Sequence, residues 1–207
     1  AAMTTGTTGG LVLSTAACMC GTDTEKMSRL PDTTGMKNEF LFQRPERWLF
    51  ERAVTQTGAK LKKVGDETKC TSDQLEAAIG DSTAGIIFVA HSRTRRSTDE
   101  MVPLEEVVRI GRKHSVPVIV DGAGQVYPVS KMRRIAQAAD LVCFGAKYIN
   151  GPNSAGYVCG SKELVEAIDL QGFLAFDELG QKGIHGGIGR AFKIDRSEIA
   201  ASVASLQ

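Results

Sequence analysis

Three short runs of consecutive apolar residues constrain the fold of this chain more than any other feature. They are GIIFVA at 85–90, VPVIV at 116–120 and LVCFG at 141–145. A run of this length without polar alternation is typical of a β-strand that is covered on both faces. Amphipathic helical patterns separate the runs, at 103–114 and 131–139. Alternating buried strands and helices predict a three-layer α/β fold, with a mostly parallel sheet and helices on both faces.

The remaining segments extend the same alternation. SDQLEAAIG at 72–80 predicts a helix with Ser72 or Asp73 as its N-cap and Gly80 as its stop. PERWLFERAVTQTG at 45–58 has apolar spacing closer to a helix than to a strand. We expect further helices at 11–20, 161–168 and 196–206, and further strands at 40–42, 60–65 and 156–160.

Composition indicates an ordinary globular protein. The 207 residues are 42% hydrophobic and 24% charged, which excludes a disordered chain. A net charge of +1 indicates no basic surface for nucleic acid or membrane, and no apolar run reaches the roughly 18 residues of a membrane span. We expect Trp48, the single tryptophan, and the phenylalanines to pack in the core. The five cysteines indicate reduced thiols in the cytoplasm, and Cys18-x-Cys20 has no second pair, so we expect no metal site.

Polar side chains follow the buried strands at the point where each strand ends. His91, Asp121 and Lys147 occupy these positions. Ligands of open α/β sheets bind at the carboxyl ends of the strands, so we expect the three side chains to converge. A partly desolvated Lys147 would have a lowered pKa and would be nucleophilic toward carbonyls. The alternative is a solvated lysine at a strand end.

Asp121 and the segment TTGTTGG at 4–10 add two further groups. A buried carboxylate needs a partner, so Asp121 could bind a metal, cap a helix, hold a cationic ring nitrogen, or form a turn with Gly122. TTGTTGG opens a helix and is either an anion site or a flexible N-cap. It matches neither the glycine motif of nucleotide-binding loops nor that of Rossmann dehydrogenases. Pyridoxal phosphate needs all three groups together: a helix start for its phosphate, an acid for its ring nitrogen and a lysine for its aldehyde.

Several segments also resemble a known family. They are TTGTTGGLVLSTAACMCG at 4–21, LPDTTGMKNEFLFQR at 30–44, IVDGAGQVYP at 119–128, DLVCFGAKYINGPNSAG at 140–156 and GIGRAFKIDRSEIAASVASLQ at 187–207. In sequence and order they are similar to the fold-type-I pyridoxal-phosphate enzymes of the selenocysteine-synthase-like family. The nearest branch is the lyases related to D-glucosaminate-6-phosphate ammonia-lyase. The resemblance runs along nearly the whole chain.

The resemblance implies a role for each matching residue. Lys147 would form the Schiff base with the cofactor and later act as the proton-transfer base, and Asp121 would pair with the pyridinium nitrogen. Ala123 would lie against one face of the ring, and Gln125 would reach its phenolic oxygen. The phosphate would be held by Thr5, Gly6 and Thr7.

Three further residues are candidate contacts of the cofactor or the substrate. His91 would touch the ring or the substrate, or else bond to backbone at its strand end. Arg93, in the basic segment HSRTRRS, would bind a phosphorylated substrate, or else belong to a solvated basic loop. Arg190 is a second candidate for the substrate. Gly145 and Ala146 fill positions where a hydroxyl residue often precedes the lysine in this superfamily.

The resemblance implies an activity and an assembly. The expected reaction is α-proton abstraction and β-elimination from an amino sugar acid or similar amino acid, with release of ammonia. The alternatives are selenium or sulfur transfer to a seryl-tRNA, or a catalytically incomplete scaffold. We expect residues 1–188 to form the cofactor-binding large domain, and 189–207, after the glycine-rich loop at 172–189, to begin a small C-terminal domain. We expect a cytoplasmic homodimer with no membrane or nucleic-acid partner. The large domain is expected to be incomplete at both ends.

Overall fold

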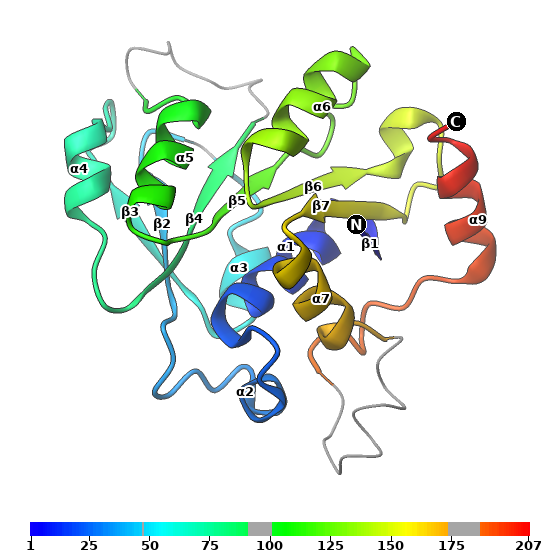
Figure 1. Cartoon of the computed structure of the whole chain (residues 1–207), viewed down its shortest axis with the longest axis horizontal. Helices are drawn as coiled ribbons and strands as arrows, with labels where there is room; N and C mark the ends of the chain where they lie inside the picture. Colours follow the sequence, from blue (N-terminus) through cyan, green and yellow to red (C-terminus); the bar gives the residue numbers. More distant parts are fainter. Residues whose placement is uncertain (47, 91–100, 174–186) are drawn as a thin grey trace.

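The computed structural model describes residues 1–46, 48–90, 101–173 and 187–207, and Figure 1 shows their arrangement. A seven-stranded sheet runs through the middle of the molecule. The strands are β1 (Ala2–Thr4), β2 (Glu39–Gln43), β3 (Lys60–Val64), β4 (Thr83–Val89), β5 (Val118–Asp121), β6 (Leu141–Gly145) and β7 (Gly156–Gly160). The helices are α1 (Gly6–Cys20), α2 (Thr24–Arg29), α3 (Arg52–Thr55), α4 (Ser72–Ala77), α5 (Leu104–Lys113), α6 (Val129–Ala138), the 3₁₀ helix η2 (Ala146–Ile149), α7 (Lys162–Gln171) and α9 (Arg196–Ala204).

The sheet is mostly parallel, as the buried runs predict. Its strand order is β1-β7-β6-β5-β4-β2-β3. The pairs from β3 through β6 are parallel, while β7 is antiparallel to both β6 and β1. The edge strand β1 was not expected, because AMT is too short to carry a pattern of its own and is defined by its pairing with β7. The carboxyl ends of β4, β5 and β6 therefore share one edge.

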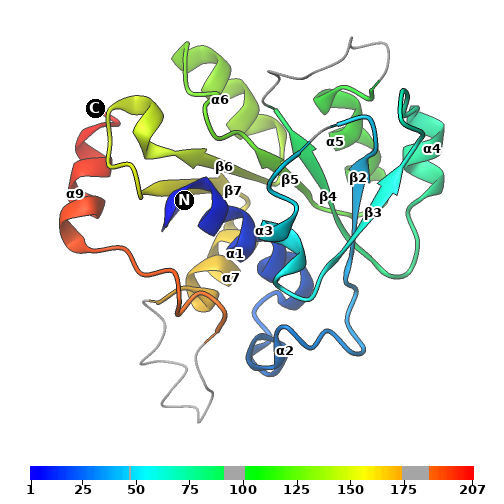
Figure 2. The ribbon, with the colours of Figure 1, turned by 180° about the vertical axis from the view of Figure 1, so that it is seen from behind.

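Helices cover both faces of the sheet, which confirms the three-layer prediction (Figures 1 and 2). One apolar cluster joins the sheet to α1, α2, α3 and α7, and a second joins the other face to α4, α5 and α6. One side of helix α1 packs against the sheet, and its opposite side packs against α7. Most residues of α1 are therefore buried. A helix buried all round needs small and apolar residues throughout, which explains its glycine- and alanine-rich sequence.

Two local expectations were wrong in detail. Among the described residues of 45–58, only the four residues of α3 are helical, because residues 49–51 form a turn before the helix begins. Helix α4 is capped by Thr71 and not by Ser72 or Asp73: the Thr71 hydroxyl accepts from the Gln74 N–H while the Gln74 side chain accepts from the Thr71 N–H. Such reciprocal bonds satisfy two backbone donors at the helix start.

Two further findings bear on the sequence-based expectations. All five cysteines are free thiols, and burial raises the pKa of Cys20 and of Cys70 to about 11. In the described part of the chain, no helix combines the length and apolar character that a membrane crossing requires.

Candidate active site

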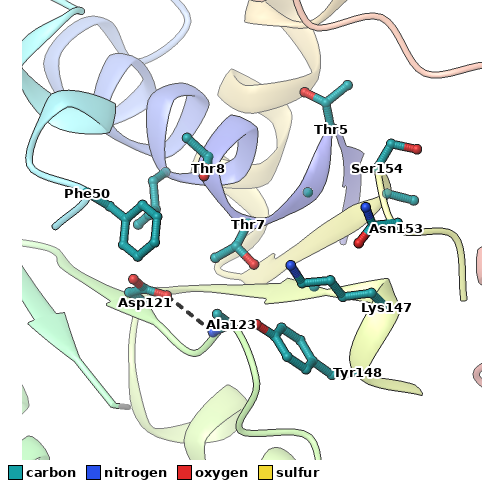
Figure 3. A pocket seen from close by; sticks show the side chains of 14 residues that line it. Thr5, Thr7, Thr8, Phe50, Asp121, Ala123, Lys147, Tyr148, Asn153 and Ser154 are labelled. Carbon is teal, nitrogen blue, oxygen red and sulfur yellow. Dashed lines mark hydrogen bonds between the residues drawn. The ribbon is translucent and has the colours of Figure 1, made fainter. Parts of the chain in front are cut away.

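A pocket of about 270 Å³ opens at the sheet edge where β5 and β6 end and α1 begins (Figure 3). The walls come from four segments that are far apart in the sequence. They are lined by Thr5, Gly6, Thr7, Thr8, Leu11, Phe50, Asp121, Ala123, Gly145, Lys147, Tyr148, Asn153, Ser154 and Ala155. The pocket thus brings together six residues predicted for the cofactor site: Thr5, Gly6, Thr7, Asp121, Ala123 and Lys147.

Strand register explains why these segments meet. Thr4 pairs with Gly156 across the β1–β7 boundary, and Gly156 pairs with Gly145 across the β7–β6 boundary. The start of α1 and the end of β6 are therefore in one row of the sheet. On the other side of β6, the Gly145 N–H donates to the Ala123 carbonyl oxygen at 3.0 Å, which fixes the turn after β5 beside it.

The start of α1 has the properties of an anion site. Gly6 adopts a φ of +62°, a conformation that favours glycine, and turns the chain into the helix. The first N–H groups of an α-helix have no partner within the helix, and its positive end attracts negative charge. Thr5 Oγ1 is buried and has no hydrogen-bond partner among the described residues. Thr7 and Thr8 extend from the same turn beside the pocket (Figure 3). These donors fit a phosphate group.

Asp121 ends β5 and is only 5% exposed. Its Oδ2 accepts from Trp48 Nε1 at 2.8 Å, and its Oδ1 accepts from the Ala123 N–H at 3.2 Å, the dashed line in Figure 3. Hydrogen bonds to the ionised form of a carboxylate favour that form. A negative charge held at the pocket wall fits a cationic ring nitrogen. Trp48, expected only to pack, does stack on Phe42 at 5.6 Å but also bonds to the predicted site residue.

Lys147 lies in η2, the 3₁₀ turn that directly follows β6. Its side chain extends along the pocket wall, with Nζ on the side where Thr7 lies (Figure 3). Nζ is also 5.2 Å from the centre of the Tyr148 ring. The residue is exposed. Of the two alternatives that the sequence left open for Lys147, the exposed side chain agrees with a solvated lysine at a strand end.

Two other predicted residues, Gln125 and Arg190, do not line the pocket. Gln125, in the loop before α6, accepts a hydrogen bond from the ammonium group of Lys131 in α6 and is not a lining residue. Arg190 is exposed and is not a lining residue. His91 and Arg93 lie outside the described residues.

Sequence reasoning missed part of the lining. Asn153 and Ser154 come from the turn after η2, and the Ser154 hydroxyl donates to the Glu198 carboxylate of α9. Phe50 and Tyr148 are about half exposed at the pocket. The signal for Asn153 and Ser154 was the turn-forming sequence NGPNSAG at 150–156, which begins three residues after Lys147. Phe50 carried none, because it was assigned to a helix.

The architecture is that of the large domain of the fold-type-I pyridoxal-phosphate enzymes. The chain belongs to the L-seryl-tRNA selenium transferase family, whose family model matches residues 50–181. Both statements confirm the family and the fold class predicted from the sequence.

Individual relatives differ in their named activities. A 5'-C-glycyluridine monooxygenase-decarboxylase from Streptomyces is 34% identical over 173 residues, which are 81% of this chain and 42% of that protein. D-glucosaminate-6-phosphate ammonia lyase from Salmonella typhimurium is 28% identical over 205 residues, 96% of this chain and 50% of the relative. The chain thus spans about half the length of the curated relatives that it matches.

Solved structures agree with these relatives. A structure of D-glucosaminate-6-phosphate ammonia-lyase matches with a TM-score of 0.83 and 26% identity, covering 99% of this chain and 52% of that one. The structure of NtdA from Bacillus subtilis, described with bound cofactor PMP, shares the fold at a TM-score of 0.65 and 16% identity, covering 99% of this chain and 43% of the other. The expectation of a pyridoxal-phosphate cofactor agrees with these neighbours.

Proposed function

We propose that the protein is a pyridoxal-phosphate enzyme in which Lys147 is the covalent attachment point and Asp121 binds the ring nitrogen. The observation that carries the proposal is that Lys147, Asp121 and the start of α1 line a single pocket. An amine, a buried carboxylate and a helix N-terminus match the aldehyde, the ring nitrogen and the phosphate of this cofactor. Ala123 would lie against the ring, and Thr5, Gly6 and Thr7 would hold the phosphate.

Asp121 and Lys147 would have separate roles in the reaction. When bound, pyridoxal phosphate supplies a ring that takes up negative charge from the carbon next to the substrate amine. The charge of Asp121 would keep the proton on the ring nitrogen, and the hydrogen bonds from Trp48 and Ala123 favour its ionised form. Lys147 Nζ, once free of the cofactor, would take the α-proton from the substrate and return a proton later.

The proposed reaction class is elimination. The α-proton would leave to Lys147, and a β-substituent would depart with its bonding electrons. The resulting enamine would take up a proton to become an imine, and water would hydrolyse that imine to a keto acid and ammonia. An amino sugar acid or a similar amino acid is the proposed substrate. The main support is the similarity to D-glucosaminate-6-phosphate ammonia lyase, which extends over nearly the whole chain. Arg93 and Arg190 stay predictions as substrate ligands.

Ammonia release tests the reaction class. The protein would be incubated with pyridoxal phosphate and D-glucosaminate-6-phosphate, and ammonia and the keto product would be quantified. We expect both products to form in equal amounts, and none with Lys147→Ala. Cofactor binding without any ammonia from this substrate or from related amino acids would refute elimination and leave the cofactor assignment standing.

A second candidate is selenium or sulfur transfer to a seryl-tRNA. The match to the L-seryl-tRNA selenium transferase model over residues 50–181 favours it. The net charge of +1 argues against a large RNA-binding surface in this chain. A tRNA gel-shift at two salt concentrations separates the candidates, because phosphate contacts weaken as salt rises. Salt-sensitive binding would favour the transferase, and no binding at low salt would favour the lyase. A catalytically incomplete scaffold is the third alternative, and it would bind no cofactor.

The assembly is part of the proposal. We expect a cytoplasmic homodimer, because fold-type-I sites are completed by a neighbouring subunit. The half-exposed rings of Phe50 and Tyr148 at the pocket support a covering partner. Sedimentation analysis tests this, and a monomer at micromolar concentration would contradict it. The division into residues 1–188 and 189–207 also stays a prediction.

A further inference from the structure

Trp48 occupies a position that packing alone does not explain. It is 7% exposed and belongs to the chain segment after β2, two residues before the pocket residue Phe50. One face of its indole stacks on Phe42 at an interplanar angle of 28°. The edge of the ring directs Nε1–H to Asp121 Oδ2 at 2.8 Å, across 73 positions of sequence. An indole N–H is a donor only, and a buried one needs an acceptor.

The carboxylate of Asp121 is held at both oxygens by donors of the protein. Trp48 donates to Oδ2, and the Ala123 N–H donates to Oδ1. Two donors on different oxygens restrict rotation of the carboxylate plane. The indole itself is fixed, because Phe42, to which it stacks, lies in the interior of the sheet and is 1% exposed.

We propose that Trp48 is a positioning residue that aims the Asp121 carboxylate at the ring nitrogen of the cofactor and keeps it ionised. The inference rests on the proposed function, since it concerns the contact between Asp121 and that nitrogen. The Trp48 N–H stabilises the charged carboxylate, so the shared proton stays on the ring nitrogen. The N–H also fixes the orientation before the cofactor arrives, so that little ordering remains to be done on binding.

A comparison of two cofactors tests the proposal. Dissociation constants of pyridoxal phosphate and of its 1-deaza analogue, in which carbon replaces the ring nitrogen, would be measured by absorption titration. Only pyridoxal phosphate can pair with Asp121, so the ratio of the two constants reports that contact alone. We expect Trp48→Phe to lower the preference for pyridoxal phosphate about tenfold, the factor that corresponds to about 1.4 kcal/mol.

Further variants separate positioning from packing. In an Asp121→Asn background, Trp48→Phe should leave the preference unchanged, because the contact that it supports is already lost. Leu49→Ala is the matched control: its side chain is 91% exposed on the same segment and donates no hydrogen bond, so the preference should stay as in the wild type.

The outcomes are distinct. An equal loss of affinity for both cofactors in Trp48→Phe would mean a merely structural role and would overturn the inference. An effect that persists in the Asp121→Asn background, or that Leu49→Ala reproduces, would overturn it as well. If the wild type fails to bind pyridoxal phosphate, that result refutes both the proposed function and this inference. Normal binding and preference in both the wild type and Trp48→Phe would refute the inference alone.

Discussion

Gly156 of β7 lies close to Gly6 at the start of α1, and it offers a direct test of how the sheet positions the pocket. A Cβ at residue 156 would lie 2.6 Å from the Gly6 carbonyl carbon and 2.6 Å from the Phe144 carbonyl oxygen. Real Cβ atoms essentially never come closer than 3.0 Å to another atom, and ordinary contacts begin at 3.4 Å. Both obstacles are backbone atoms, so no rotamer change relieves the clash. Gly156→Ala must therefore push the β1–α1 junction away from β7.

The expected cost follows from this geometry. Overpacking a well-packed position costs about 1–3 kcal/mol, and here two backbone contacts are violated, so we expect the upper part of that range. Equilibrium unfolding in urea would measure it as a lower midpoint with an unchanged slope. Gly6 begins the phosphate-binding turn, so we also expect at least about a tenfold loss of pyridoxal-phosphate affinity, because small displacements at such sites are costly.

A matched glycine serves as the control. Gly80 is exposed, and a Cβ placed there would meet nothing within 4 Å. Gly80→Ala should therefore change the free energy of unfolding by less than about 0.5 kcal/mol and leave cofactor affinity unchanged. If Gly156→Ala behaves like Gly80→Ala in both measurements, the close approach of β7 to α1 is not what positions the pocket.

Two further predictions concern groups outside the pocket. The Lys113 and His114 side chains hydrogen-bond to Glu76 and lower its pKa from the usual 4.5 to about 2. This stabilisation is present above pH 4.5 and is lost as the pH falls toward 2, so the stability difference between wild type and Glu76→Gln should shrink in that window; a constant difference across it would contradict the assignment. Buried Gln43 bonds to both the N–H and the carbonyl oxygen of Val102, at 2.7 and 3.0 Å. Gln43→Leu leaves both groups unpaired and should cost about 2–4 kcal/mol in urea unfolding, whereas a loss below about 1 kcal/mol would mean that water replaces the amide.

Much of the fold could be predicted because the strongest patterns lie in its centre. The buried strands β4, β5 and β6 need apolar side chains on both faces, so their sequences are continuous apolar runs that have few other interpretations. Asp121 is the last residue of β5, and Lys147 comes two residues after the end of β6. The prediction of these strands therefore also located both residues at the carboxyl edge of the sheet. The edge strand β1 and the four-residue helix α3 had no such signal, because tertiary contacts define them.

The rest of the site depends on distances that sequence spacing does not encode. The Trp48–Asp121 hydrogen bond joins residues that are far apart in the chain, and an apolar ring next to Leu49 and Phe50 suggested only packing. The Gly145 position illustrates the same limit. The family resemblance implies a hydroxyl side chain shortly before the lysine, and Gly145 carries none. In the structure, the Thr7 hydroxyl lies 3.2 Å from where a Gly145 Cβ would be. A side chain from α1 therefore occupies space that the local sequence leaves open.

Trapping of the cofactor on the protein tests the central claim most directly. The purified protein would be mixed with pyridoxal phosphate, reduced with borohydride, digested, and mapped by mass spectrometry, with Lys147→Ala as the control. We expect a visible absorption band before reduction and a single reduced adduct on Lys147, and we expect both to be missing in the variant. An adduct on another lysine, or a band that survives Lys147→Ala unchanged, would contradict it.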